Sequence, residues 1–183
     1  MDRLKKNFLE IDRLPNWLVC DLRSDHAGEV GAVCIYQGIL AVSRSSELRD
    51  FAQAHLVTEQ KHLCALEEML PPHARSRFIL FWRLAGFLTG AIPALFGKKA
   101  TYATIAAVET FVDQHYQEQI DLLQQQALYP ELAKLLESFR LDEVAHQREA
   151  AEGVKTEPGW LLNTWCGLVS SGSAVAVSIA KWG

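Results

Sequence analysis

The sequence repeats one pattern of acidic, aromatic and imidazole side chains in its two halves. Each half has a glutamate followed seven residues later by a tyrosine, and then an E-x-x-H pair; the members are Glu29, Tyr36, Glu59 and His62 in one half and Glu109, Tyr116, Glu143 and His146 in the other. With 14 Glu and 6 His in 183 residues, about half of one E-x-x-H pair is expected by chance, so the repeated context carries the signal. Residues three or seven apart share one face of an α-helix, so each half can direct these side chains to one point.

Apolar residues recur at intervals of three and four along most of the chain, and no run alternates with a period of two. This pattern predicts an all-α fold. The first long helix is expected to begin near Ser24 or Asp25, because either residue is a good N-cap. The second is expected to be capped by Ser45 or Ser46 and to stop at the prolines 71–72. These two helices would form one antiparallel pair.

A second pair follows in the same arrangement. One long helix is predicted from Lys99 to Gln126, and the next begins after "LYP" and ends near Gly153, at the position after a helix end that favours glycine. Two further apolar segments, about 76–97 and 159–182, lie outside these four helices. We therefore expect a single domain over 1–183, with a four-helix core bundle at about 23–153.

The repeated carboxylates indicate a metal centre in the bundle. Burying ionised carboxylates without a partner is very costly, and two divalent cations would supply the opposite charge. Four-helix proteins with a di-iron or di-manganese centre use one Glu from each of two helices and an E-x-x-H pair from each of the other two. Solvent-exposed helix faces are the alternative, which the apolar neighbours of each candidate disfavour. The candidate metal ligands are Glu29, Glu59, His62, Glu109, Glu143 and His146.

Longer motifs give the chain a specific family resemblance. The stretches "DHAGEVGA", "EQKHL", "AAVETFVDQHYQEQI" and "LDEVAHQ", with the intervening "AGFLTGAIPALFGKKA", resemble the demethoxyubiquinone hydroxylase family of ubiquinone biosynthesis over about residues 20–152. The resemblance implies a ferritin-like bundle in which the six candidates are iron ligands. It also implies a di-iron monooxygenase that uses O₂ to hydroxylate the ring of a polyprenyl demethoxyubiquinone. An external reductant is expected, with NADH as one candidate; because the sequence has no nucleotide-binding fingerprint, it does not decide between NAD(P)H, a flavoprotein and the quinol itself.

Other residues are candidates for roles around the centre. Ligand histidines usually donate their second N–H to a carboxylate or carbonyl. His115 and Tyr116 match positions that the family associates with substrate and electron transfer, although His115 points about 120° away from Glu109 on an ideal helix. The tyrosines could also be ordinary interior residues with satisfied hydroxyls. The residues considered for these outer roles are Tyr36, Asp113, His115, Tyr116, Asp142 and His26.

The two apolar segments suggest contact with a membrane. Residues 78–97 are long enough to span a bilayer, but Arg83, Pro93 and three glycines interrupt the run. We expect this segment to lie on the membrane surface, with its flanking basic residues toward anionic head groups. Residues 159–182 have tryptophans near both ends, as interfacial segments often do. Packing into the protein core is the alternative for both. A polyprenyl benzoquinone substrate would be collected from the bilayer.

Composition narrows location and partners. The N-terminal "MDRLKKNFLE" has no apolar leader, which predicts the cytoplasmic face of a bacterial inner membrane, or a mitochondrial inner membrane for a processed form. The four widely spaced cysteines are expected to be reduced and buried. Net charge is −4 and basic residues are scattered, so nucleic acid is not an expected partner. A homodimer or a complex of ubiquinone biosynthesis is compatible with a membrane-facing surface. Other acidic residues, such as Glu149, are expected to be exposed.

Two other functions stay open on the sequence alone. A ferritin-like di-iron oxidase or peroxidase would use the same ligands without a quinone. A metal-free, membrane-attached interaction protein would use the same bundle, and removing a buried like-charged carboxylate such as Glu143 would then leave it unharmed or stabilise it.

Overall fold

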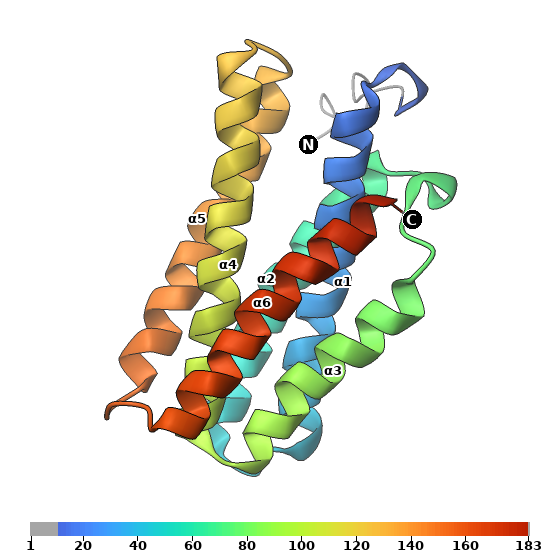
Figure 1. The fold of residues 1–183 in the computed structure, drawn as a ribbon. Helices are drawn as coiled ribbons and strands as arrows, with labels where there is room; N and C mark the ends of the chain where they lie inside the picture. Colours follow the sequence, from blue (N-terminus) through green and yellow to red (C-terminus); the bar gives the residue numbers. More distant parts are fainter. Residues whose placement is uncertain (1–10, 183) are drawn as a thin grey trace.

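The computed structural model of the protein describes residues 11–182, and this part of the chain is helical with short connections (Figure 1). The predicted all-α fold is therefore confirmed over these residues. The N-terminal stretch on which the absence of a leader was judged, 1–10, lies outside them. In chain order the elements are η1 (Ile11–Arg13), α1 (Asn16–Val42), α2 (Ser46–Met69), η2 (Pro72–Ala74), α3 (Ile79–Leu95), α4 (Lys98–Gln125), α5 (Pro130–Gly153) and α6 (Trp160–Trp182).

The start of α1 differs from the prediction. The helix begins at Asn16, about two turns before the expected start at Ser24 or Asp25, so that prediction was wrong. Ser24 lies inside the helix, where its hydroxyl donates to a backbone carbonyl 2.7 Å away. The additional turns carry Leu18 and Leu22, which are fully buried in a core cluster shared with α2, α4 and α5. Burial of these two side chains stabilises the extension more than a cap at Ser24 would.

Two other helix ends were predicted from local residue types, one at Ser45 and one at Gly153. Ser45 caps α2 as predicted, and its hydroxyl accepts from the backbone N–H of Leu48 at 3.4 Å. Gly153 was predicted to follow the last helix of the bundle, but it is the last residue of α5. A Cβ at Gly153 would lie 2.5 Å from the ring of Tyr102. Glycine is needed there for close packing of α5 on α4 and not for a positive φ.

The core of the bundle divides into two apolar clusters. The pairs α1–α2 and α4–α5 are each in close contact along their length. One cluster includes Leu66, Tyr116 and Phe139, and the other includes Tyr36 and Phe51. Tyr116 and Tyr36 both turn their hydroxyls toward buried glutamates. A polar layer therefore lies between the two apolar clusters, inside the bundle.

The remaining helices, α3 and α6, cover one side of the bundle (Figure 1). α3 packs tightly along α1, since a Cβ at Gly90 would lie 1.9 Å from the carbonyl oxygen of Ile35. α6 crosses α1 and α4 diagonally, and the indole of Trp165 donates to the hydroxyl of Thr104 at 2.9 Å (Figure 1). Both apolar segments thus pack partly against the bundle.

Much of α3 and α6 nevertheless faces outward. Leu80 and Phe96 near the ends of α3 are each 79% exposed, and Trp160 and Trp182 at the ends of α6 are 75% and 91% exposed. Over residues 11–182, α6 is the one helix long and apolar enough to cross a membrane by length and composition, and α3 is apolar but shorter. These two helices therefore combine an inner face on the bundle with an apolar outer face.

The cysteines are free thiols, as predicted, but their predicted burial was wrong. Cys64 is exposed on α2, and the other three, Cys20, Cys34 and Cys166, are partly exposed. Leucine and alanine fill most of the core positions that the cysteines were expected to share.

Candidate metal centre

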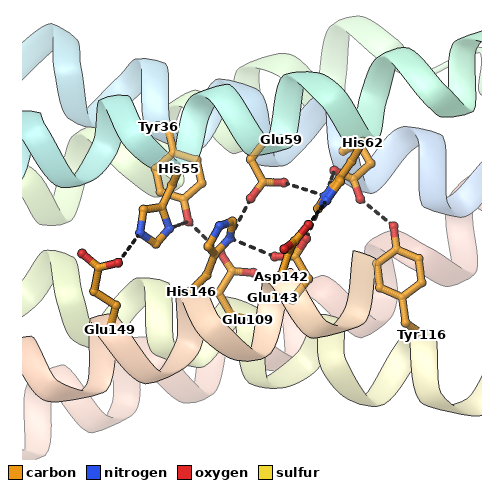
Figure 2. A network of polar contacts seen from close by, with 11 residues as sticks. Tyr36, His55, Glu59, His62, Glu109, Tyr116, Asp142, Glu143, His146 and Glu149 are labelled. Carbon is orange, nitrogen blue, oxygen red and sulfur yellow. Dashed lines mark hydrogen bonds and ion pairs between the residues drawn. The ribbon is translucent and has the colours of Figure 1, made fainter. Parts of the chain in front are cut away.

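The six candidate ligands converge in the polar layer from four helices, and all of them except Glu29 are labelled in Figure 2. Each is between 1% and 7% exposed, so the bundle encloses all of them. Within each E-x-x-H pair, the three-residue spacing places both side chains on the inner face of the helix. They are Glu29 from α1, Glu59 and His62 from α2, Glu109 from α4, and Glu143 and His146 from α5.

The donor atoms form two overlapping groups. In each group one atom per residue lies within 4.8 Å of the others; the groups are Glu29, Glu59, His62 and Glu143, and Glu59, Glu109, Glu143 and His146. Glu59 and Glu143 belong to both groups. Each group thus offers three carboxylates and one imidazole, and two central carboxylates are in reach of both positions. This is the arrangement expected for a pair of carboxylate-bridged cations.

Several of these atoms have no protein partner to satisfy them. Glu29 Oε2, Glu59 Oε1, His62 Nδ1 and Glu143 Oε1 are buried without a hydrogen-bond partner among the described residues. His62 Nδ1 lies 3.1 Å from Glu143 Oε1, and His146 Nδ1 lies 3.1 Å from Glu59 Oε1, but without hydrogen-bond geometry. Buried polar atoms left in this state are costly. Two divalent cations would satisfy them, and the oxygen and imidazole donors suit iron or manganese.

The electrostatics of the carboxyls reflect their crowding. Burial and the nearby Glu143 raise the pKa of Glu29 to about 7. Burial and the same neighbour raise the pKa of Glu59 and of Glu109 well above the ordinary value. Without cations, these carboxyls therefore hold protons at a pH where an exposed glutamate is ionised.

Glu143 and His62 behave in the opposite way. Burial alone would raise the pKa of Glu143, but His146 and His62 outweigh it and hold that pKa at about 2. Burial alone would lower the pKa of His62, but Glu143 and Glu29 raise it to about 9. An anionic Glu143 beside a cationic His62 thus occupies the centre of the metal-free site.

Three predicted outer residues contact the candidate ligands (Figure 2). The hydroxyl of Tyr36 donates to Glu109 Oε1 at 2.9 Å, and that of Tyr116 donates to Glu29 Oε1 at 2.5 Å. Each tyrosine therefore holds the glutamate of the opposite helix pair. Asp142 Oδ2 lies 3.0 Å from His62 Nε2, which leaves Nδ1 of that ring directed at the centre.

A chain of contacts that the sequence did not reveal continues from Tyr36 to the surface. His55 Nδ1 lies 3.3 Å from the Tyr36 hydroxyl, and His55 Nε2 lies 3.0 Å from Glu149 Oε2 (Figure 2). The His55 ring also lies against that of His146, with centroids 4.0 Å apart. Glu149 is exposed, as predicted, and it forms this contact with His55. The available signal was the seven-residue spacing from His55 to His62, which puts both on one face of α2.

The other predicted outer residues lie elsewhere. Asp113 pairs with Arg140 at 2.8 Å on the side of the bundle. His26 is buried, 3.7 Å from Glu67 on α2. His115 Nε2 lies 3.0 Å from Asp25 Oδ1, so its ring is held by α1 and not by a ligand glutamate.

An apolar cavity of about 430 Å³ reaches the centre from the side covered by α3 and α6. Its inner wall contains Glu29, Glu59, Glu109 and Glu143. Its outer wall comes from α3 and α6 and is lined mainly by apolar side chains and glycines. The covering helices therefore enclose a space for an apolar molecule directly beside the carboxylate cluster.

Comparison with known proteins agrees with this arrangement. The family model described as "Ubiquinone biosynthesis protein COQ7" matches residues 16–180. A 3-demethoxyubiquinol 3-hydroxylase of Rhodospirillum rubrum is 34% identical over 164 residues, covering 87% of this chain and 76% of that protein. Mitochondrial NADPH-dependent 3-demethoxyubiquinone 3-hydroxylases are 31% identical in Rattus norvegicus, over 87% of this chain and 75% of that protein, and 31% identical in Caenorhabditis elegans, over 87% of each.

Proposed function

The chain belongs to the family of the ubiquinone biosynthesis protein COQ7, and on that premise we propose that it hydroxylates the ring of a polyprenyl demethoxyubiquinone. The observation that carries the proposal is a cluster of four carboxylates and two imidazoles whose carboxylates line an apolar cavity. Ring hydroxylation needs an oxygen-activating centre beside a dry space that holds the ring, and a carboxylate–imidazole cluster next to an apolar cavity supports both requirements.

Two iron ions fit the donors of the cluster. Glu59 and Glu143 would be shared by both ions, and the remaining donors would bind as two pairs, Glu29 with His62 and Glu109 with His146. When bound, such a centre takes electrons from an external donor and activates O₂ for transfer of one oxygen atom to an electron-rich ring. The protein itself need not provide a nucleophile.

The side chains around the cluster position the ligands and exclude water. Tyr36 and Tyr116 each donate to a ligand glutamate and so restrict its orientation. Asp142 does the same for the ring of His62. Supporting groups of this kind raise metal affinity and keep the geometry fixed during turnover. The apolar walls of the cavity keep bulk solvent from the reacting ring.

The outer faces of α3 and α6 favour attachment to a membrane. Their exposed apolar side chains, such as Leu80, Leu84, Trp160 and Leu168, lie on the two helices that also wall the cavity. A protein lying on the bilayer through these faces would receive a polyprenyl quinone without exposing it to water. We propose that the protein lies at the cytoplasmic face of a bacterial inner membrane or at the mitochondrial inner membrane. Relatives in this family that are named mitochondrial support the second location.

The electron donor and the assembly follow from the same proposal. Relatives are named NADPH-dependent, and this supports an external nicotinamide donor, NADH or NADPH, for this chain. The exposed apolar faces could also pair two copies or bind other proteins of ubiquinone biosynthesis. The chain would act as one ferritin-like domain.

The test combines metal content with product analysis. Protein purified in detergent and loaded with ferrous ion should bind close to two irons per chain and, after reduction and exposure to O₂, add one oxygen atom to a demethoxyubiquinone analogue. Glu59→Ala and His146→Ala should lose iron and product while keeping their helical content, and Glu131→Ala, on the exposed surface of α5, should keep both. If the protein binds two irons but gives no hydroxylated ring, the result would favour a ferritin-like oxidase or peroxidase. If it binds no metal, the metal-free interaction protein is the function that remains.

A further inference from the structure

A second polar cluster lies in the wall of the cavity, apart from the metal ligands. Asp25 on α1 faces His115 and Gln119 on α4, and its Oδ1 lies 3.0 Å from His115 Nε2 and accepts from Gln119 Nε2 at 2.6 Å. Asp25 and His115 both line the cavity. The side chain of Asp25 is completely buried. This cluster is one helical turn before Glu29, so it is close to the metal centre along the same wall.

Two acceptor atoms of the cluster have no donor. Asp25 Oδ2 and Gln119 Oε1 are buried and lack a hydrogen-bond partner among the described residues. The nitrogens of His115 and Gln119 that face Asp25 lie next to its Oδ1 and 2.8 Å from each other, and neither reaches Asp25 Oδ2. A buried acceptor without a donor costs free energy, and a carboxylate oxygen costs more than a neutral one. What is missing from this part of the cavity is therefore a hydrogen-bond donor.

The two redox forms of the substrate differ in this property. A benzoquinone has two carbonyl oxygens, which only accept hydrogen bonds, whereas the reduced quinol has two hydroxyls, which donate. A carbonyl placed against Asp25 Oδ2 would put two acceptors in contact, and a hydroxyl would satisfy the carboxylate with a charge-assisted bond. A site with matched polar groups rejects the form that leaves them unpaired.

We propose that Asp25, supported by Gln119, selects the reduced quinol form of the substrate by accepting a hydrogen bond from a ring hydroxyl. The proposal rests on the proposed function, because it assumes that the cavity holds the benzoquinone ring. It adds to that function a specificity-determining residue, and the redox form agrees with the name of the Rhodospirillum rubrum relative, a 3-demethoxyubiquinol 3-hydroxylase. In this role His115, which contacts Asp25 Oδ1, is a positioning residue.

The test measures binding of both forms without turnover. Full-length protein in detergent, loaded with redox-inert Zn²⁺ and kept anaerobic, is titrated with a demethoxyubiquinone that has a short isoprenoid tail, once oxidised and once reduced. Binding is followed by quenching of the tryptophans Trp82 and Trp165, which line the cavity. The quinol should bind roughly ten-fold more tightly than the quinone, which is the usual effect of one well-placed hydrogen bond to a charged group.

Substitution should reverse this preference. In Asp25→Asn, His115 and Gln119 hold the amide oxygen at the Oδ1 position, and the amide N–H₂ takes the place of Oδ2 as a donor. The variant should then bind the quinone more tightly than the quinol. Gln119→Leu should reduce the quinol preference without reversing it, and it decides the matter if the first variant does not fold. Asp121→Asn, at an exposed pair on α4, should behave like the unchanged protein.

The outcomes separate this inference from the function on which it rests. Binding of both forms with equal affinity, or a preference that Asp25→Asn leaves unchanged, would overturn the role of Asp25 while the hydroxylase function stands. If neither form binds to a protein that still loads two metal ions, the cavity is not a quinone site, and both proposals fail.

Discussion

Metal loading of this protein should release protons, and the number follows from the site. In the metal-free protein, burial and like charge keep protons on carboxyls that must be ionised to bind a cation. Glu29 has a pKa of about 7, and those of Glu59 and Glu109 are raised well above the ordinary value. His62, with a pKa of about 9, also carries a proton that a cation at Nδ1 would displace. Glu143 is already ionised and contributes none.

These states predict release of roughly two to four protons per chain at pH 7 when both metal positions fill. The sign follows from the direction of the shifts. A carboxyl or imidazole whose pKa is raised holds its proton more firmly, so the apparent metal affinity falls as pH falls. The logarithm of the overall binding constant should then rise by about two to four for each pH unit near neutrality. An exposed carboxylate site would show almost no dependence there, since its groups are already ionised.

The assay is anaerobic calorimetry of ferrous ion binding in buffers of different ionisation enthalpy at pH 7, which counts protons directly. Glu59→Gln removes one proton that could be released, so the count should drop by about one if the variant still loads metal. Glu131→Gln, at an exposed ion pair on α5, serves as the control and should not change the count. Release of less than one proton by the unchanged protein would refute the assignment of the buried carboxyls as neutral acids in the metal-free state.

Three further predictions test the helix packing, a hydrogen bond to a candidate ligand, and the proposed membrane attachment. Gly90→Ala forces a Cβ to 1.9 Å from a carbonyl of α1 and should cost about 1–3 kcal/mol in chemical denaturation, whereas Gly167→Ala, with open space on α6, should be neutral or stabilising. Tyr36→Phe leaves Glu109 without its donor and should weaken metal binding roughly ten-fold in competition titrations, and Tyr102→Phe, whose hydroxyl donates to Glu47, should not. Deleting residues 160–183 should weaken sedimentation with liposomes, and unchanged partitioning would argue against membrane attachment through α6.

The placement of the six candidate ligands could be anticipated because it depends on local geometry. Spacings of three and seven residues fix which side chains share a helix face, whatever the helix packs against. The exchange of tyrosines between the pairs, Tyr36 to Glu109 and Tyr116 to Glu29, could not be anticipated. That contact depends on how one helix pair is set against the other, and no local spacing encodes the offset.

Predictions from residue type alone were wrong where the packing of other side chains has the larger effect. Ser24 is a good cap by residue type, yet α1 continues through it because Leu18 and Leu22 gain more by packing into the core. Gly153 fits a position after a helix end, yet the ring of Tyr102 explains it better. In both cases the deciding neighbour is distant in the sequence, so the residue type alone was ambiguous.

The position of His115 on α4 follows from local helix geometry, but its role depends on the covering helices α3 and α6. On α4 it is six residues after Glu109, which is about 120° around an ideal helix, and its ring contacts Asp25 on α1. α3 and α6 turn that side of α1 and α4 into the wall of a cavity, and there His115 holds Asp25 in place. The apolar insert and the last helix thus turn an outer face of the bundle into the wall of the cavity that contains Asp25, the residue proposed to distinguish a quinol from a quinone.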